Sequence, residues 1–283
     1  MRGNALIDEQ LSKNPQYNKR FQECLDEMEK LIVETEDKGK KLVLKEHGYQ
    51  LMFPPTFNAH LDKPLEETPL PKMVDHSLDI PVEKRKTSNS EEDESPSLPI
   101  PNPTYIPDRL FITFKPVLII RHPALAIPSY LRAAAVLGGT VFDEDMVVET
   151  QYKWQRLIYD CYKAWYDSKG MSGAFPVVID GDKLINDTQS QMTRLCELIG
   201  VEPSGIQYSW DVKDQFENKV SESFIGTIGR STGVIRKEEN RVPLIAEEAE
   251  KWAGEWDQDT AEKMRFYAEK AMPDYQYLLE RSI

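Results

Sequence analysis

The chain has 283 residues, of which 40% are hydrophobic and 29% charged, the composition of an ordinary globular protein. Acidic residues outnumber basic ones by 48 to 35, giving a net charge of −13. This argues against a nucleic-acid-coating function, because most of the surface would repel a polyanion. No run of about 18 apolar residues and no apolar signal core occur, so we expect no membrane contact and a cytoplasmic location. The few cysteines and histidines show no metal-ligand spacing, so we expect no metal.

One segment differs sharply in composition from the rest. Residues 54–107 hold 11 of the 19 prolines, and within them 84–103 read KRKTSNSEEDESPSLPIPNP. Such a polar stretch buries too little apolar surface to offset its ordering entropy. We therefore predict a disordered insertion at 82–103 inside a single domain that spans 1–283, since neither flank is rich enough to form a full core alone.

The first predicted elements are a helix, two strands and a second helix. Apolar residues recur at helical spacing and predict a helix over 16–36, which Gly39 ends. KLVLKEH (41–47) is typical of a buried strand with a polar end, and PVLIIRHP (116–123) of a second one. A helix follows over 124–136, with Pro128 placed near its first turn.

The later elements continue the alternation. We predict a long amphipathic helix over 146–169, a third strand over 175–180, and a helix that Asp187 or Thr188 caps and Gly200 ends. Residues 206–242 read as irregular, and Asp259 to Glu262 resembles a capping box for a last helix. The fold class is therefore α/β, a mostly parallel sheet flanked by helices, with ligands expected at the carboxyl ends of the strands.

The strongest local signal for chemistry is RHPALAIPS, from Arg121 to Ser129. An arginine at a strand end and a serine eight residues later can converge on one anion, because guanidinium and hydroxyl groups both donate hydrogen bonds. The start of the following helix adds positive potential. Taken alone, an arginine at a strand end is more often part of a structural ion pair.

The second signal is Lys45-Glu46-His47 at the end of the first predicted strand. Residues i and i+2 of an extended chain point to the same side. There His47 can accept a proton near neutral pH, and Lys45 can stabilise developing negative charge. The alternative is a solvated strand edge, which is the commoner case for charged residues of this kind.

Together these residues give the chain a resemblance to the sulfotransferase family over about residues 40–240. The resemblance implies a P-loop NTPase-like α/β fold and the donor 3′-phosphoadenosine 5′-phosphosulfate (PAPS). It implies that Arg121 and Ser129 hold the 3′-phosphate, that His47 deprotonates the acceptor hydroxyl, and that Lys45 assists at the sulfuryl group. The divergent microbial and fungal members are more similar to this chain than the animal cytosolic enzymes.

Two further segments carry the same resemblance. VIDGDKLINDTQSQMTRLCELIGVEP (178–203) is similar to a strand and helix of the family. GRSTGVIRK (229–237) resembles its basic loop over the 3′-phosphate, with Arg230 and Gly233 as candidate ligands and Arg236 and Lys237 beside them.

One expected motif is missing. The family opens with a strand and a Gly-rich loop that cradles the 5′-phosphosulfate, and no G-x-x-x-x-G-K-[ST] occurs here. Three explanations stay open: the sequence is a piece of a longer protein, the activity has been lost while the scaffold remains, or the N-terminal helix and another strand repair the site.

The sequence therefore leaves two functions open. The first is a transferase that moves a sulfuryl group from PAPS to a hydroxyl of a small organic acceptor, in secondary-metabolite biosynthesis. The second is a catalytically inactive or repurposed scaffold that binds a partner. A nucleotide-dependent kinase is disfavoured because the phosphate loop is absent. The oligomeric state is not predicted.

Overall fold

The computed structural model describes residues 19–61, 74, 97–171, 173, 175–236 and 241–283. These fall into two compact units. The first holds the described residues of Val117–Arg156 and Pro176–Ile283, and the second those of Pro15–Pro116 and Leu157–Phe175. The division falls inside one helix. The predicted insertion at 82–103 lies outside the described residues up to 96.

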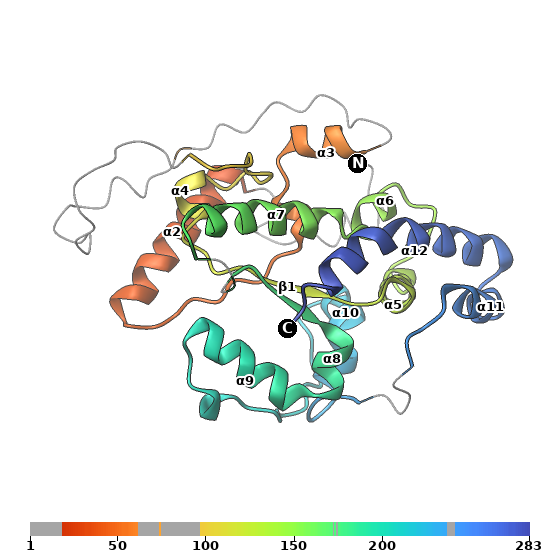
Figure 1. The fold of residues 1–283 in the computed structure, drawn as a ribbon. Helices are drawn as coiled ribbons and strands as arrows, with labels where there is room; N and C mark the ends of the chain where they lie inside the picture. Colours follow the sequence, from red (N-terminus) through yellow and green to blue (C-terminus); the bar gives the residue numbers. More distant parts are fainter. Residues whose placement is uncertain (1–18, 62–73, 75–96, 172, 174, 237–240) are drawn as a thin grey trace. The chain divides into compact units, whose positions relative to one another are not determined.

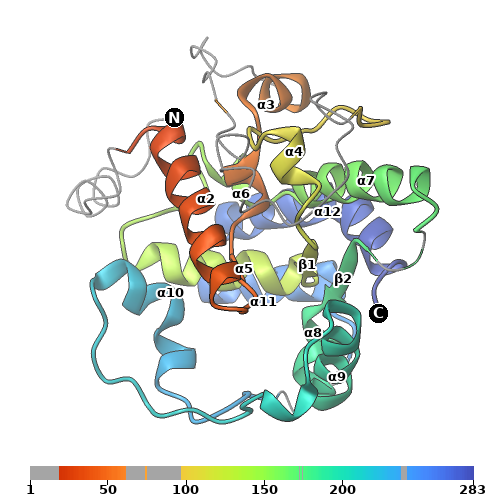
Figure 2. The same ribbon diagram turned by 90° about the vertical axis from the view of Figure 1, so that its left-hand side faces the viewer.

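A pair of parallel strands forms the sheet of the first unit. β1 (Val117–Ile120) pairs with β2 (Val177–Asp180) in a register that sets Ile120 opposite Asp180. Figure 2 shows the two strands side by side, with α8 leading directly away from β2. Both short apolar runs were predicted as strands, and both predictions are confirmed. The predicted α/β class is also confirmed, with two parallel strands in the described sheet.

The predicted strand over 41–47 is wrong. The segment is assigned to no strand, and Val43 and Leu44 are exposed, Val43 to 84%. An apolar run becomes a strand only when a neighbour satisfies its backbone groups. The described residues offer this segment no ladder partner, so Val43 and Leu44 face outward.

The helices of the first unit follow the strands in chain order. They are α5 (Pro123–Ala135), α6 (Met146–Glu149), α8 (Gly181–Asn186), α9 (Thr188–Ile199), the 3₁₀ turn η4 (Pro203–Gly205), α10 (Lys219–Gly229), α11 (Ile245–Glu255) and α12 (Gln258–Leu279). The helix α11 packs on α12, and α12 packs on α5 and on both strands (Figure 1).

Four details of these helices differ from prediction. Pro128 lies inside α5, because Pro123 takes the first helical position instead. The 146–169 helix is interrupted at 150–152, between α6 and α7 (Lys153–Ser168). The helix α10 lies in the region predicted as irregular, and its Asn218 cap accepts from the Ser221 amide. The last helix is capped by Asp257, not by Asp259.

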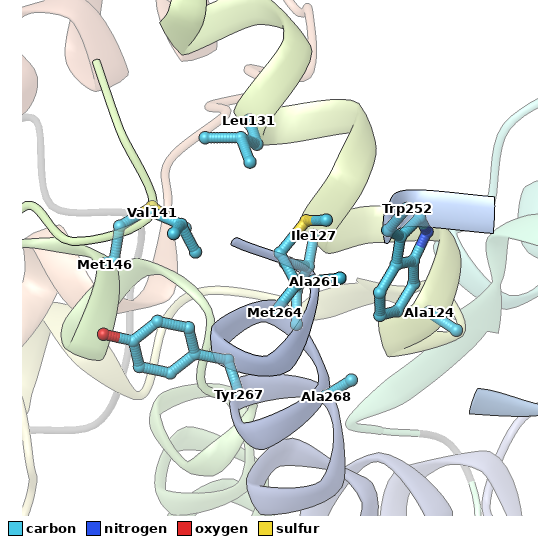
Figure 3. Packing of buried hydrophobic residues seen from close by; sticks show 10 residues of the cluster. All are labelled: Ala124, Ile127, Leu131, Val141, Met146, Trp252, Ala261, Met264, Tyr267 and Ala268. Atoms are coloured by element: carbon cyan, nitrogen blue, oxygen red, sulfur yellow. The ribbon is translucent and has the colours of Figure 1, made fainter. Parts of the chain in front are cut away.

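The core of the first unit lies between α5, α11 and α12. Figure 3 shows Met264 and Ala261 of α12 facing Ile127 of α5, with Trp252 of α11 beside Ala124. All five side chains are almost fully removed from water. Because Ala124 and Ile127 belong to the first two turns of α5, this core fixes the helix that begins directly after β1.

The described part of the second unit is built from helices and helical turns. They are α2 (Phe21–Asp37), η1 (Gly48–Leu51), α3 (Pro54–His60), α4 (Asp108–Phe111) and the later turns of α7. The prediction of a helix over 16–36 is confirmed within its described residues. Tyr162 of α7 stacks on Phe111, with ring centroids 4.0 Å apart, and donates to the Phe111 carbonyl at 2.7 Å.

Among the described residues, no helix is both long enough and apolar enough to cross a membrane.

Candidate functional site

The junction between β1 and α5 places Arg121 at the carboxyl end of the parallel pair, where ligands of α/β folds collect. The Arg121 Nε atom is buried and has no hydrogen-bond partner among the described residues. Buried donors are nearly always paired in folded proteins. An unpaired guanidinium nitrogen at this position therefore fits an anionic ligand, such as a phosphate.

His122 follows Arg121 and caps α5. Its Nδ1 atom accepts a hydrogen bond from the Ala124 amide at 3.2 Å, which leaves the proton of the neutral ring on Nε2. The ring packs edge-on against Tyr275 of α12, with centroids 5.3 Å apart. Burial lowers the His122 pKa, although nearby carboxylates, Asp182 foremost, oppose this. His122 is therefore a structural cap rather than a free base.

The carboxyl end of β2 lies beside Arg121, because Asp180 pairs with Ile120 in the sheet. Asp180 caps α8 by accepting from the Asp182 amide at 3.2 Å, and burial raises its pKa. The next residue is Gly181, where an added Cβ would stand 3.1 Å from the Ile120 carbonyl and 3.8 Å from the Arg121 Cβ. Glycine thus lets the start of α8 approach the stem of Arg121.

Ser129 lies on the second turn of α5 and is exposed. At 1.5 Å per residue it stands about 9 Å along the axis from Pro123. No hydrogen bond joins its hydroxyl to Arg121, so the structure places the two residues on one strand–helix unit without a direct contact between them in the described residues.

The predicted basic loop is partly described. Arg230 ends α10, forms an ion pair with Glu222, and lies over the Phe216 ring at 5.1 Å from its centroid. Gly233 forms an isolated bridge with Ser209, and an added Cβ there would meet the Tyr208 carbonyl at 3.1 Å. Arg236 is exposed, and Lys237 lies outside the described residues.

Lys45 and His47 belong to the second unit and are both exposed. They reach each other without a strand: Lys45 Nζ lies 2.7 Å from His47 Nε2. Burial lowers the His47 pKa, and the Lys45 charge lowers it further. The ring is therefore neutral at pH 7, with Nε2 accepting from the ammonium, and this neutral form is the one that can take up a proton.

Sequence reasoning therefore found Arg121 but missed its surroundings. Asp180 had a signal, since it is the polar residue that ends an apolar run. Tyr152, from the α6–α7 junction, hydrogen-bonds to the Arg121 backbone through its hydroxyl, and Tyr275 comes from α12; neither residue had a signal in the sequence. The described residues contain no group of three or more His, Cys, Asp or Glu side chains that could hold a metal ion.

The chain is similar over its whole length to two proteins named sulfotransferase ppzF. The protein from Metarhizium majus (strain ARSEF 297) is 26% identical over 294 aligned positions, and that from Metarhizium rileyi (strain RCEF 4871) is 25% identical over 294. Each alignment covers 100% of this chain and 82% of the relative. No family model and no solved structure matches the chain. Both relatives are named sulfotransferase, so the two similarities point to a sulfotransferase-like family.

Proposed function

We propose that the protein transfers a sulfuryl group from PAPS to a hydroxyl group of a small organic acceptor, in secondary-metabolite biosynthesis in the cytoplasm. The observation that carries the proposal is the full-length similarity to two proteins named sulfotransferase. The unpaired, buried Arg121 Nε at the carboxyl end of β1 agrees with it, because this position suits a phosphate of the donor.

At the nucleotide end, Arg121 is the main ligand of the 3′-phosphate. Its planar fork of donors matches a phosphate, and its Nε has no competing partner among the described residues. Ser129 adds a hydroxyl that makes no hydrogen bond in the described structure. Arg230 has to exchange its Glu222 partner for phosphate before it contributes, and Gly233 gives backbone access beside it.

At the reacting end, PAPS supplies an activated sulfuryl group and a bisphosphate leaving group when it is bound. His47 accepts the proton of the acceptor hydroxyl at Nε2, the nitrogen that Lys45 contacts at 2.7 Å. Lys45 therefore has to turn away from the ring, which frees its ammonium to balance negative charge at the sulfuryl group. The lowered pKa keeps His47 neutral and ready to accept the proton. The proposal calls for no metal ion, nucleic acid or membrane.

The first test is thermal unfolding with adenosine 3′,5′-bisphosphate. At 100 times the Kd, binding stabilises the folded state by about 2.7 kcal/mol, which raises the midpoint by about 5–10 °C. Arg121→Ala should remove most of this rise. Arg194→Ala, which removes an exposed arginine of α9, is the control and should keep it. A bisphosphate-induced rise that survives Arg121→Ala contradicts the assigned site.

The second test is turnover with labelled PAPS and a panel of small hydroxyl compounds. His47→Ala should lower kcat by about 10²–10⁴-fold, the usual contribution of a general base. A decrease of less than about threefold would remove His47 from the reaction.

A second candidate is a scaffold that binds the nucleotide or a partner without transfer. It is favoured by the exposed, strand-free setting of Lys45 and His47 and by the absence of a G-x-x-x-x-G-K-[ST] motif in the sequence. It predicts bisphosphate binding with no sulfated product for any acceptor. Detection of sulfated product that depends on His47 rules it out.

A further inference from the structure

A single tyrosine hydroxyl holds both backbone groups of Arg121. The Tyr152 hydroxyl donates to the Arg121 carbonyl at 2.5 Å and accepts from the Arg121 amide at 3.2 Å. The two residues are 31 positions apart. Tyr152 lies in the short break between α6 and α7, which is where the predicted single helix fails.

The backbone needs such a partner at this point. The ladder between β1 and β2 ends with the pair Ile120 and Asp180, and the next residue of the second strand, Gly181, already begins α8. Arg121 thus leaves the ladder with an amide and a carbonyl that a further strand would otherwise satisfy. The Tyr152 hydroxyl takes the place of that strand.

Tyr152 itself packs against an aromatic residue of α12. Its ring lies 5.8 Å from the ring of Tyr275 on α12, and Tyr275 also packs against His122. Gly181 brings the start of α8 against the Arg121 stem. Burial raises the Tyr152 pKa to about 12, so the hydroxyl keeps its proton throughout the physiological range and remains a donor.

We propose that Tyr152 is a positioning residue, which fixes the backbone of Arg121 so that its guanidinium is preorganised for the phosphate of the nucleotide. The inference rests on the proposed function, because it assumes that Arg121 is a phosphate ligand. Tyr152 touches no ligand in this scheme. It reduces the conformational entropy that Arg121 loses on binding. The affinity gained in this way therefore requires the contact between Arg121 and the phosphate.

The experiment is a double-mutant cycle of Tyr152→Phe and Arg121→Ala, read by calorimetric titration with two ligands. Adenosine 3′,5′-bisphosphate carries the 3′-phosphate, and adenosine 5′-phosphate lacks it. Tyr152→Phe should weaken bisphosphate binding about three- to tenfold, the range of one hydrogen bond, and change 5′-phosphate binding less than twofold. In the Arg121→Ala background, Tyr152→Phe should change either affinity less than twofold.

Two variants serve as matched controls. Tyr162→Phe removes another tyrosine-to-carbonyl hydrogen bond, to Phe111 at 2.7 Å, and so reports the effect of losing such a bond elsewhere. Tyr275→Phe keeps the ring contacts with Tyr152 and His122 but removes the hydroxyl. Both controls should leave the bisphosphate affinity within twofold of the wild-type value.

The outcomes separate the inference from the function on which it rests. If Arg121→Ala does not weaken bisphosphate binding, the proposed phosphate ligand is wrong. If Arg121→Ala weakens it and Tyr152→Phe does not, the positioning role is overturned. An equal loss for both ligands, or a loss that persists without the Arg121 side chain, also overturns it and shows a general structural role.

If the Tyr152→Phe protein does not fold, hydrogen exchange of the wild-type protein is measured instead. The Tyr152 hydroxyl accepts from the Arg121 amide, so this amide should be protected in the free protein. An Arg121 amide that exchanges freely before adenosine 3′,5′-bisphosphate binds overturns the inference.

Discussion

Replacement of Met264 by alanine tests whether the core of the first unit supports the nucleotide site. Met264 is fully buried at 0% exposure, between α5 and α12, and lies in the same cluster as Ile127 of α5 (Figure 3). Alanine removes most of this side chain from a close-packed environment that relaxes only in part. The expected loss is about 2–5 kcal/mol, the range for such truncations in cores.

This loss converts into a measurable shift. For a domain of 150–250 residues, 1 kcal/mol corresponds to about 2–4 °C in Tm, so Met264→Ala should lower the midpoint by about 4–20 °C. Met171 follows α7 and is 48% exposed, so Met171→Ala is the matched control and should change stability by less than about 0.5 kcal/mol. Both are measured by differential scanning calorimetry at pH 7.

The same variants carry a functional readout. Met264 belongs to α12 and lies in the core cluster with Ile127 of α5, away from the Arg121 guanidinium in the sequence and in role. At temperatures well below its midpoint, Met264→Ala should therefore bind adenosine 3′,5′-bisphosphate within about threefold of wild type. A midpoint within 1 °C of wild type, or an equal decrease in Met171→Ala, would refute the packing of α12 on α5. A folded variant that loses binding altogether would show that the core shapes the site directly.

Two further predictions concern titration. Lys45→Met removes a charge that lowers the His47 pKa, so the acid limb of the pH profile of kcat/KM should move to higher pH. The control Lys40→Met should leave the limb in place. An unmoved limb in Lys45→Met would show that Lys45 does not influence the catalytic base. Burial raises the pKa of Asp180, which is 7% exposed, so the fold loses stability as pH rises from the unfolded value of about 3.9 through the folded one. Asp180→Asn keeps an acceptor for the Asp182 amide. Its stability relative to wild type should increase from pH 3 to pH 7. Asp180→Ala lacks this cap and should be about 0.5–2 kcal/mol less stable than Asp180→Asn. Urea unfolding at both pH values measures this, and equal stabilities of the two variants would refute the capping role.

Local chemistry made several elements predictable. The apolar runs of β1 and β2 and the periodicity of α2 and α9 are properties of neighbouring residues. Gly200 ends α9 with φ of 69°, a conformation that glycine adopts without strain. The glycine at this place in the sequence was therefore enough to predict the end of the helix. The same applies to Arg121, whose place after an apolar run put it at the end of a strand.

Other features were invisible in the sequence. The segment 41–47 has the composition of a strand, but pairing requires a neighbour, and composition does not supply one. The helix α10 was missed although Phe224 and Ile228 stand four residues apart, because much of its apolar face is exposed and its pattern resembles that of a loop with scattered apolar residues.

The sequence by itself determined the two strands, the helices α5 and α9, and the candidate residues Arg121, Ser129, Lys45 and His47, but not the short helix α8 that directly follows β2. Only the tertiary structure decided what surrounds Arg121. Tyr152 bonds its backbone from 31 positions away, and Gly181 reaches it across the end of the sheet. The physical reason is that periodicity and capping act within a few residues, whereas hydrogen bonds to a strand end are made by whichever distant segment the packing of the core brings there.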